Sequence, residues 1–318
     1  MKKFLVAACI VALIFLAHWL ALRLVFDNSR LSHVTPVYNS LGQDISVVSF
    51  SPAITEMVYL LGLEDYLAGV TAYCVYPEPA RSKQKIGGYY DPNMELVLRI
   101  APDYALIGTE HEALSQRLQR MGIEPVVLDA STPDSILESL RKIAGLFNIQ
   151  DKAEEVINQL ENRIKYLENA VKELPRPRVM LVFGEQMGGG STNTRCVVGD
   201  DLFYTPLIEL AGGVNVVTQS AIKYPMISDE AVLRLNPDII IELIYSDAPQ
   251  PVAINEIMGP WKHLNQVNAV KNQQIYVMTA DYIFIPGPRF VSIAETFFSI
   301  LHPQQENTGD HDNTRTER

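Results

Sequence analysis

Two stretches of the 318-residue chain repeat one another and fix the basic plan of the molecule. Residues Tyr89 to Asp103 read YYDPNMELVLRIAPD, and residues Tyr224 to Asp238 read YPMISDEAVLRLNPD. Seven of the fifteen positions are identical: a leading tyrosine, a glutamate, a Val-Leu-Arg run and a closing Pro-Asp pair. Such a repeat predicts two related lobes, with the same structural element at the same place in each.

Each copy of the repeat is predicted to be a short helix that leads into a buried strand. A proline near the end of each copy cannot continue a helix, and the runs that follow, Tyr-Ala-Leu-Ile and Ile-Ile-Ile, are apolar. The leading tyrosines are expected in loops of the kind where α/β sheets bind ligands. Tyr89 and Tyr224 are therefore predicted to face each other across a cleft between the lobes, unless the repeat records only a duplicated fold and the tyrosines serve packing.

The overall charge excludes nucleic acid as the partner. The chain has 26 Lys and Arg against 37 Asp and Glu, a net charge of -11. It has no basic stretch that would neutralise phosphates. Apolar residues make up 47% and charged residues 20% of the sequence, which is close to the average for globular proteins and leaves enough material for two cores.

The first 30 residues predict a membrane-associated segment. Two lysines follow Met1, and the stretch Phe4 to Phe26 is almost wholly apolar and long enough to cross a bilayer. No pair of small residues follows it at signal-cleavage spacing, so an uncleaved anchor is favoured over a cleaved signal peptide or a lipoprotein site at Cys9. The body is expected outside the cytoplasm, on a polar tether formed by residues 31–43.

The spacing of apolar residues divides the remaining chain into two lobes and a connecting helix. Residues 44–148 and 176–303 alternate strand and helix patterns, which predicts an α/β fold with a mainly parallel sheet in each lobe. Within residues 149–175, apolar side chains recur every three or four positions from Asp151 to Leu174. This pattern predicts one stiff helix of 24 residues, about 36 Å long, that joins the lobes. Residues 304–318 are polar and are predicted to be an unstructured tail.

Three further motifs accompany the repeat: Ser51-Pro-Ala-Ile-Thr-Glu56, Tyr73 with Tyr76-Pro77, and Pro288-Arg289. With the repeat, they make residues 44–303 resemble the extracytoplasmic substrate-binding proteins of ABC importers for cobalamin, iron-siderophores and haem. The resemblance implies two α/β lobes joined by one long helix, which capture a small ligand and deliver it to a membrane permease with its ATPase. We expect a monomer without a cofactor of its own.

In that family, a glutamate on the surface of each lobe engages arginines of the permease, and the matching positions are Glu95 and Glu230. Opposed carboxylates, one per lobe, suit a two-fold symmetric permease. The alternative is an ordinary helix ion pair, because Arg99 and Arg234 each follow a glutamate by four positions. The identical spacing in both copies favours docking.

The ligand cleft implied by the resemblance is lined by aromatic side chains, which bury corrins and porphyrins well. The residues assigned to it are Tyr73, Tyr89, Tyr224, Tyr282 and Ser51. Arg195 and Arg289 are available for an anionic siderophore chelate, although Arg289 can instead cap its helix or pair with a carboxylate. Haem would need an axial ligand such as Met187, Met226 or His111. The ligand class stays open.

Each lobe carries one cysteine, Cys74 or Cys196. A disulfide between them would clamp the lobes, and a thiol pair facing the cleft would bind a soft metal. Two unrelated thiols would do neither. The sequence leaves these three alternatives open.

Catalytic motifs are incomplete in this sequence. The segment Gly184 to Ser191 follows a predicted strand and is glycine-rich, but position 190 is glycine where a phosphate-binding loop needs lysine. No HExxH motif is present and the six histidines are scattered, so zinc chemistry lacks its parts. We expect a binding protein and not an enzyme. The alternative function is a membrane-anchored module that senses a metal complex without feeding an importer.

Overall fold

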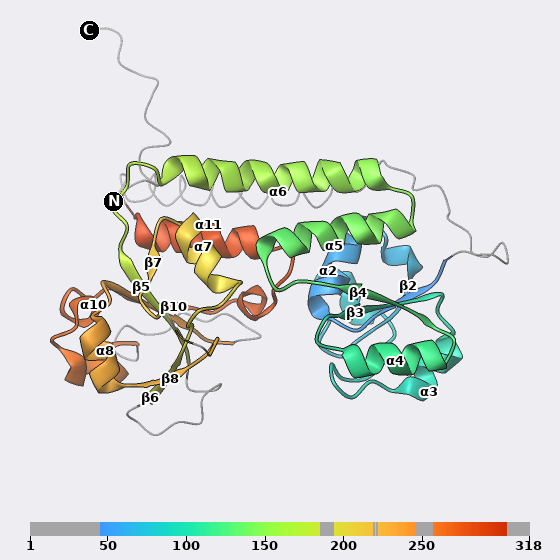
Figure 1. Cartoon of the computed structure of the whole chain (residues 1–318), viewed down its shortest axis with the longest axis horizontal. Coiled ribbons are helices and arrows are strands. Elements are labelled where there is room, and N and C mark those ends of the chain that lie inside the picture. The colour runs from blue at the N-terminus through green and yellow to red at the C-terminus, as the bar shows by residue number, and fades with distance from the viewer. Residues whose placement is uncertain (1–44, 185–193, 219, 221, 246–256, 304–318) are drawn as a thin grey trace, which may run out of the picture.

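The computed structural model describes residues 45–184, 194–218, 220, 222–245 and 257–303, which form two lobes side by side (Figure 1). The predicted anchor, tether and tail lie outside these residues, as do Met187 and nearly all of the glycine-rich segment. None of the helices in the described ranges is both long and apolar enough to cross a membrane.

The N-terminal lobe contains a four-stranded parallel sheet in the order β2-β1-β3-β4. Its strands are β1 (Val47–Ser49), β2 (Leu67–Val70), β3 (Tyr104–Gly108) and β4 (Glu124–Leu128). Its helices are α2 (Pro52–Leu60), α3 (Met94–Ile100), α4 (Glu112–Arg120) and α5 (Pro133–Leu146), with short 3-10 helices η2 (Glu64–Tyr66) and η3 (Glu78–Ser82). The central strands β1 and β3 are buried along nearly all their length, which explains their continuous apolar sequences.

The C-terminal lobe contains a mixed sheet in the order β10-β9-β5-β6-β8, with β7 also paired to β5. The strands are β5 (Arg178–Phe183), β6 (Thr194–Val197), β7 (Val214–Asn215), β8 (Met226–Ser228), β9 (Ile239–Leu243) and β10 (Ile275–Met278). The helices are α7 (Tyr204–Leu210), α8 (Asp229–Leu235), α10 (Asn268–Lys271) and α11 (Phe290–Leu301), with 3-10 helices η4 (Gly259–Leu264) and η5 (Asp281–Phe284). The pairs β5–β6 and β6–β8 are antiparallel, and the other pairs are parallel, so the sheet is mainly parallel as predicted.

The two copies of the sequence repeat form equivalent helices with equivalent ends. The side chain of Asn93 accepts a backbone N–H from the first turn of α3, and the hydroxyl of Ser228 does the same for α8. Each helix ends at a residue with left-handed backbone just before the proline, Ala101 at φ 49° and Asn236 at φ 44°. The predicted helix-to-strand unit is confirmed in both lobes.

One long helix, α6 (Gln150–Ala170), runs along one side of the molecule over both lobes (Figure 1). Its 21 residues give about 31 Å at 1.5 Å per residue, shorter than predicted because the chain turns at Val171. The helix packs on α5 of the N-terminal lobe and on α7 and α11 of the C-terminal lobe. Arg163 also donates to Glu295 of α11 at 2.8 and 2.6 Å, which ties the helix to the second lobe.

A single cluster of buried apolar side chains extends through both lobes. It includes Leu106 of β3, Leu160 of α6, Leu181 of β5 and Phe290 of α11. Two further clusters each belong to one lobe, one holding Val97 of α3 and the other holding Val232 of α8 and Trp261 of η4. The lobes therefore share one core and keep a separate core beneath each repeated helix.

Candidate functional site

The lobes meet through an ion pair between Glu56, in the second turn of α2, and Arg289, which precedes α11. Each helix begins after the carboxyl end of a parallel strand, since α2 follows β1 directly and α11 follows β10 and η5. Nε and Nη2 of Arg289 donate to the two carboxylate oxygens of Glu56 at 2.9 and 2.5 Å, and Nη1 donates to Asp281 at 3.1 Å. This pair joins the carboxyl ends of the two sheets, the edge at which α/β proteins bind ligands.

Two tyrosines, one from each lobe, lie against the guanidinium group of Arg289. Its central carbon is 3.8 Å from the ring centroid of Tyr76 and 5.0 Å from that of Tyr282, distances typical of cation–π contacts. Burial raises the pKa of Glu56 to about 7 against the opposing effect of Arg289. The sequence suggests Arg289 as a ligand contact, but the structure commits its donors to Glu56 and Asp281.

Tyr89 belongs to a polar and aromatic cluster beyond the carboxyl end of β3. Its hydroxyl donates to the carboxylate of Glu110, and its ring packs edge-on against Tyr90 with centroids 4.8 Å apart. Nε2 of His111 bonds to the backbone carbonyl of Tyr89 at 3.0 Å, and the Ser51 side chain lies near the Tyr89 phenol. Burial, followed by the bond to Glu110, raises the pKa of the Tyr89 phenol, so the phenol is neutral.

Tyr224 has a matching arrangement in the C-terminal lobe. Its hydroxyl donates to Oδ2 of Asp201 at 2.9 Å, while Oδ1 of Asp201 accepts the backbone N–H groups of Phe203 and Tyr204 at 2.7 and 2.6 Å. Its ring packs edge-on against Phe183 with centroids 5.1 Å apart. Burial, followed by the charge of Asp201, raises the pKa of the Tyr224 phenol. In each lobe, therefore, the tyrosine of the repeat donates to a carboxylate of the same lobe.

Arg195 lies on the opposite face of the sheet from this cluster. It alternates along β6 with Cys196, which packs against the shared core that contains Phe183. Its guanidinium carbon is 4.1 Å from the ring centroid of Trp261, which belongs to the separate core that also contains Val232 of α8. Arg195 therefore contacts Trp261 on the face of the sheet opposite the Tyr224 cluster, and not the predicted ligand site. This follows because successive side chains of a strand point to opposite faces.

The same arginine holds the first turn of α8. It donates to the carboxylate of Asp229 and, at 3.1 Å, to the carbonyl of Pro260. Asp229 also pairs with Nε2 of His263 at 2.6 Å. These contacts fix the turn that carries Glu230.

The remaining predicted site residues are less closely held. Tyr73 lies in the loop after β2 with 62% of its surface exposed, and the described residues give it no hydrogen bond or ring contact. Cys74 and Cys196 are both free thiols, so the disulfide alternative is wrong. The buried Cys74 accepts a hydrogen bond from Thr55 at 3.1 Å. No cluster of three His, Cys, Asp or Glu side chains suited to a metal ion occurs in the part of the chain that the structure describes.

Both predicted docking glutamates are exposed and lie on equivalent helices. Figure 1 places α3 and α8 on the side of the molecule away from α6, one on each lobe. Among the described residues, no ion pair joins Glu95 to Arg99 or Glu230 to Arg234, so the helix-pair alternative is not formed. A leucine three positions after each glutamate is also exposed, Leu98 by 48% and Leu233 by 38%.

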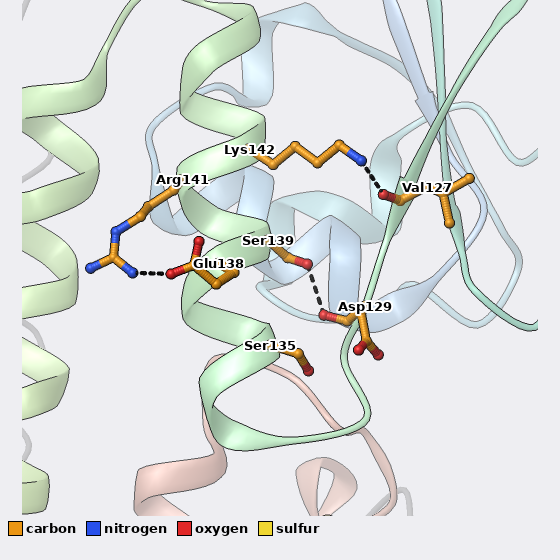
Figure 2. Close-up of a pocket in the computed structure, with 7 residues that line it drawn as sticks. All are labelled: Val127, Asp129, Ser135, Glu138, Ser139, Arg141 and Lys142. Atoms are coloured by element: carbon orange, nitrogen blue, oxygen red, sulfur yellow. Dashed lines mark hydrogen bonds and ion pairs between the residues drawn. The ribbon is translucent and has the colours of Figure 1, made fainter.

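A surface groove of about 560 Å³ lies between α5 and β4, and none of the predicted site residues lines it (Figure 2). Its lining consists of Val127, Asp129, Ser135, Glu138, Ser139, Arg141 and Lys142. Lys142 donates to the carbonyl of Val127 and Ser139 to the carbonyl of Asp129, each at 2.7 Å. The polar groups of the groove mostly bond to one another, so we assign no ligand to it.

Comparison with known proteins identifies the family. Residues 47–282 match the model of a family described as periplasmic binding protein. The chain belongs to this family. Proteins of this family bind substrates for ABC importers outside the cytoplasm, and the family is not one of enzymes.

Similar proteins carry names that agree with this membership. The ABC transporter substrate-binding lipoprotein YvrC of Bacillus subtilis is 26% identical over 263 residues, which span 81% of this chain and 80% of the relative. The vitamin B12-binding protein of Pectobacterium atrosepticum is 30% identical over 203 residues, which span 61% of this chain and 70% of the relative.

Solved structures confirm the predicted two-lobed α/β fold. The periplasmic haem-binding protein HutB of Vibrio cholerae has a TM-score of 0.70 at 21% identity, covering 81% of this chain and 99% of its own. The periplasmic vitamin B12-binding protein of the same organism has a TM-score of 0.66 at 21% identity, covering 82% and 98%.

Sequence reasoning missed four polar residues of the site in this periplasmic binding protein. Glu56 and Tyr76 stand inside motifs that carry the family resemblance, so a signal for them existed. Glu110 and Asp201 had no such signal, because each meets its tyrosine only through the fold, across 21 and 23 positions of chain respectively.

Proposed function

We propose that this periplasmic binding protein captures a metal chelate or corrinoid between its lobes and delivers it to an ABC permease. The observation that carries the proposal is the repeated unit. Each lobe has a carboxylate-bound tyrosine at the beginning of the repeat and an exposed, unpaired glutamate on the helix that follows. The relatives named for vitamin B12 and the solved haem-binding structures support a large planar ligand.

The proposed ligand surface includes Tyr89 and Tyr224, with Ser51 beside Tyr89. Tyr282 and Tyr76 lie against Arg289 at the junction of the lobes, and the exposed Tyr73 joins them as the most accessible of the set. Flat aromatic faces bury planar ligands, and phenol oxygens accept hydrogen bonds from their edges. Arg195 and Arg289 are left out of this surface, because both already serve the protein's own carboxylates.

The proposed permease contacts are Glu95 and Glu230, each with its neighbouring exposed leucine. A hydrogen bond from Ser228 lowers the pKa of Glu230, which keeps this carboxylate charged. A charge beside an apolar side chain suits an interface in which the carboxylate sets the orientation and the leucine is buried. We further propose a monomer without enzymatic activity, tethered to the membrane by residues 4–26. The sensor alternative is less favoured, because YvrC is named as an ABC transporter component.

Substitution of the two glutamates tests docking. We expect Glu95→Ala and Glu230→Ala together to leave ligand affinity unchanged and to lower uptake of labelled ligand by cells that contain the protein and its permease. Glu112→Ala is the matched control, because Glu112 is an exposed first-turn glutamate of α4 on the same lobe as Glu95. Wild-type uptake by the double variant would refute the docking assignment.

A further inference from the structure

The charges around the proposed cleft narrow the class of ligand, an inference that rests on the proposed function. A binding site for an anionic chelate or for haem propionates needs cationic groups that are free to pair with the ligand. The sequence offers Arg195 and Arg289 for this purpose. The structure places each of them against carboxylates of the protein.

Arg289 cannot serve as an anion site without breaking the junction of the lobes. One guanidinium charge is shared between Glu56 and Asp281, and 87% of the Arg289 side chain is buried. The cluster therefore has no excess positive charge. Removing one partner from a buried charge pair leaves the other charge uncompensated, and a ligand carboxylate would have to offset that cost.

In both tyrosines of the repeat, the phenol oxygen is a hydrogen-bond acceptor that lies next to a carboxylate of the protein. The phenols of Tyr89 and Tyr224 use their protons in bonds to Glu110 and Asp201, so their oxygen lone pairs are what remain for a ligand. Glu110 keeps 42% of its side chain exposed, and its second oxygen adds another acceptor. A surface made of these phenol and carboxylate oxygens favours ligand groups that donate hydrogen bonds, and it repels ligand carboxylates. Because both phenols stay neutral, neither is suited to bind ferric iron as a phenolate.

The lysines nearest in sequence to the two tyrosines do not offset the negative charge of Glu110 and Asp201. Lys85 donates to the backbone carbonyls of Cys74 and Ala80 at 2.8 and 3.0 Å. Lys223, exposed next to Tyr224, is the cation nearest in sequence to either tyrosine, and its single charge does not neutralise the two carboxylates Glu110 and Asp201. Segments 185–193 and 246–256 lie outside the described residues, and their sequences contain no lysine, arginine or histidine.

We propose that the cleft takes a neutral or cationic planar ligand with hydrogen-bond donors along its edge, the chemistry of an amide-bearing corrinoid. Anionic ferric chelates and haem are disfavoured. The carboxamide N–H groups of such a ligand donate to the phenol and carboxylate oxygens, and the macrocycle packs on the tyrosine rings.

The test compares two ligands that differ only in edge charge. The full-length protein in detergent is titrated by calorimetry with a dicyano-corrin that carries peripheral carboxamides, and with the same corrin after hydrolysis of these groups to carboxylates. Haemin and a ferric tris-catecholate complete the series. We expect the amide form to bind at least about tenfold more tightly than the carboxylate form, because like charges oppose one another in the cleft.

Two variants make the test specific to the proposed residues. Glu110→Gln keeps an acceptor and removes the charge, and it is expected to reduce the preference for the amide form severalfold. Glu124→Gln, at an exposed position of β4 in the same lobe, should keep the wild-type preference. Tighter binding of the carboxylate corrin, haemin or the tris-catecholate would overturn the inference while leaving ligand capture in place. Absence of binding by all four ligands would overturn the inference too, and the uptake assay then decides the proposed function separately.

Discussion

Tyr89 and Tyr224 begin the two copies of the repeat, and each donates to a carboxylate of its own lobe. The two carboxylates differ in burial. Asp201 is 5% exposed, whereas the side chain of Glu110 is 42% exposed. Water can replace a lost hydrogen-bond partner at Glu110 but not at Asp201, so equivalent substitutions should affect the two lobes differently.

We predict that Tyr224→Phe lowers the free energy of unfolding by about 1 to 2 kcal/mol, because a buried oxygen of Asp201 loses its donor. Tyr89→Phe should change it much less. Both variants should weaken ligand binding. Urea denaturation and calorimetric titration measure the two effects, with Tyr166→Phe as control because Tyr166 is 69% exposed on α6. Equal losses of stability in the two variants would contradict this account.

Glu56 should make stability depend on pH. Burial raises its pKa from 4.5 to about 7, so the folded protein holds this proton more tightly than the unfolded chain does. Its contribution to the free energy of unfolding is fully present below about pH 4.5 and is lost as pH rises through about 7. We predict that Glu56→Gln removes a pH-dependent component on the order of 3 kcal/mol. Urea denaturation at several pH values measures this component. Parallel curves of unfolding free energy against pH for the wild-type protein and Glu56→Gln would rule it out.

At the scale of secondary-structure elements, the sequence predicts best where a helix terminator is followed by an apolar run. β3 and β9 lie where the apolar runs after Pro102 and Pro237 predict strands, because the prolines end the preceding helices and the strands are buried. β6 and β8 were not predicted, since they contain only four and three residues and carry polar side chains. The partners of Arg195 and Arg289 could not be predicted either, because Asp229 and Glu56 lie far from them along the chain.

The placement of Arg195 behind α8 gives a prediction for that helix. Arg195→Met should leave ligand affinity unchanged and lower uptake, because Asp229 loses its main cation and the turn that carries Glu230 becomes less fixed. The direct ligand contact suggested by the sequence gives the opposite result, a loss of affinity. Calorimetric titration and cellular uptake of the same variant distinguish these outcomes. Arg178→Met provides a control, since Arg178 contacts the other end of α8 through the carbonyl of Leu235.

At the scale of the whole molecule, the shared core joins two lobes that resemble separate domains. Its members come from both sheets and from α6, and the ion pair between Arg163 and Glu295 adds a polar contact. Cooperative unfolding is expected where one core serves both halves. The connecting helix therefore acts as part of the core.

We predict that the protein unfolds in a single thermal transition detected alike by calorimetry and circular dichroism. Leu160→Ala should lower the free energy of unfolding by about 2 to 5 kcal/mol without splitting the transition, because Leu160 lies in the shared core. Asn158→Ala, on the exposed face of α6, should leave it nearly unchanged. Two resolved transitions in the wild-type protein would show that the lobes unfold independently.

The contact between Glu56 and Arg289 spans 233 positions of the chain. During synthesis from the N-terminus, the last strand of the first sheet ends at Leu128. At that point Arg289, the partner of Glu56, has not yet been synthesised. The junction of the lobes can close only after the start of α11 has been made. A growing chain thus contains the first sheet before the shared core and the junction of the lobes are complete, so both form only when the polypeptide is nearly finished.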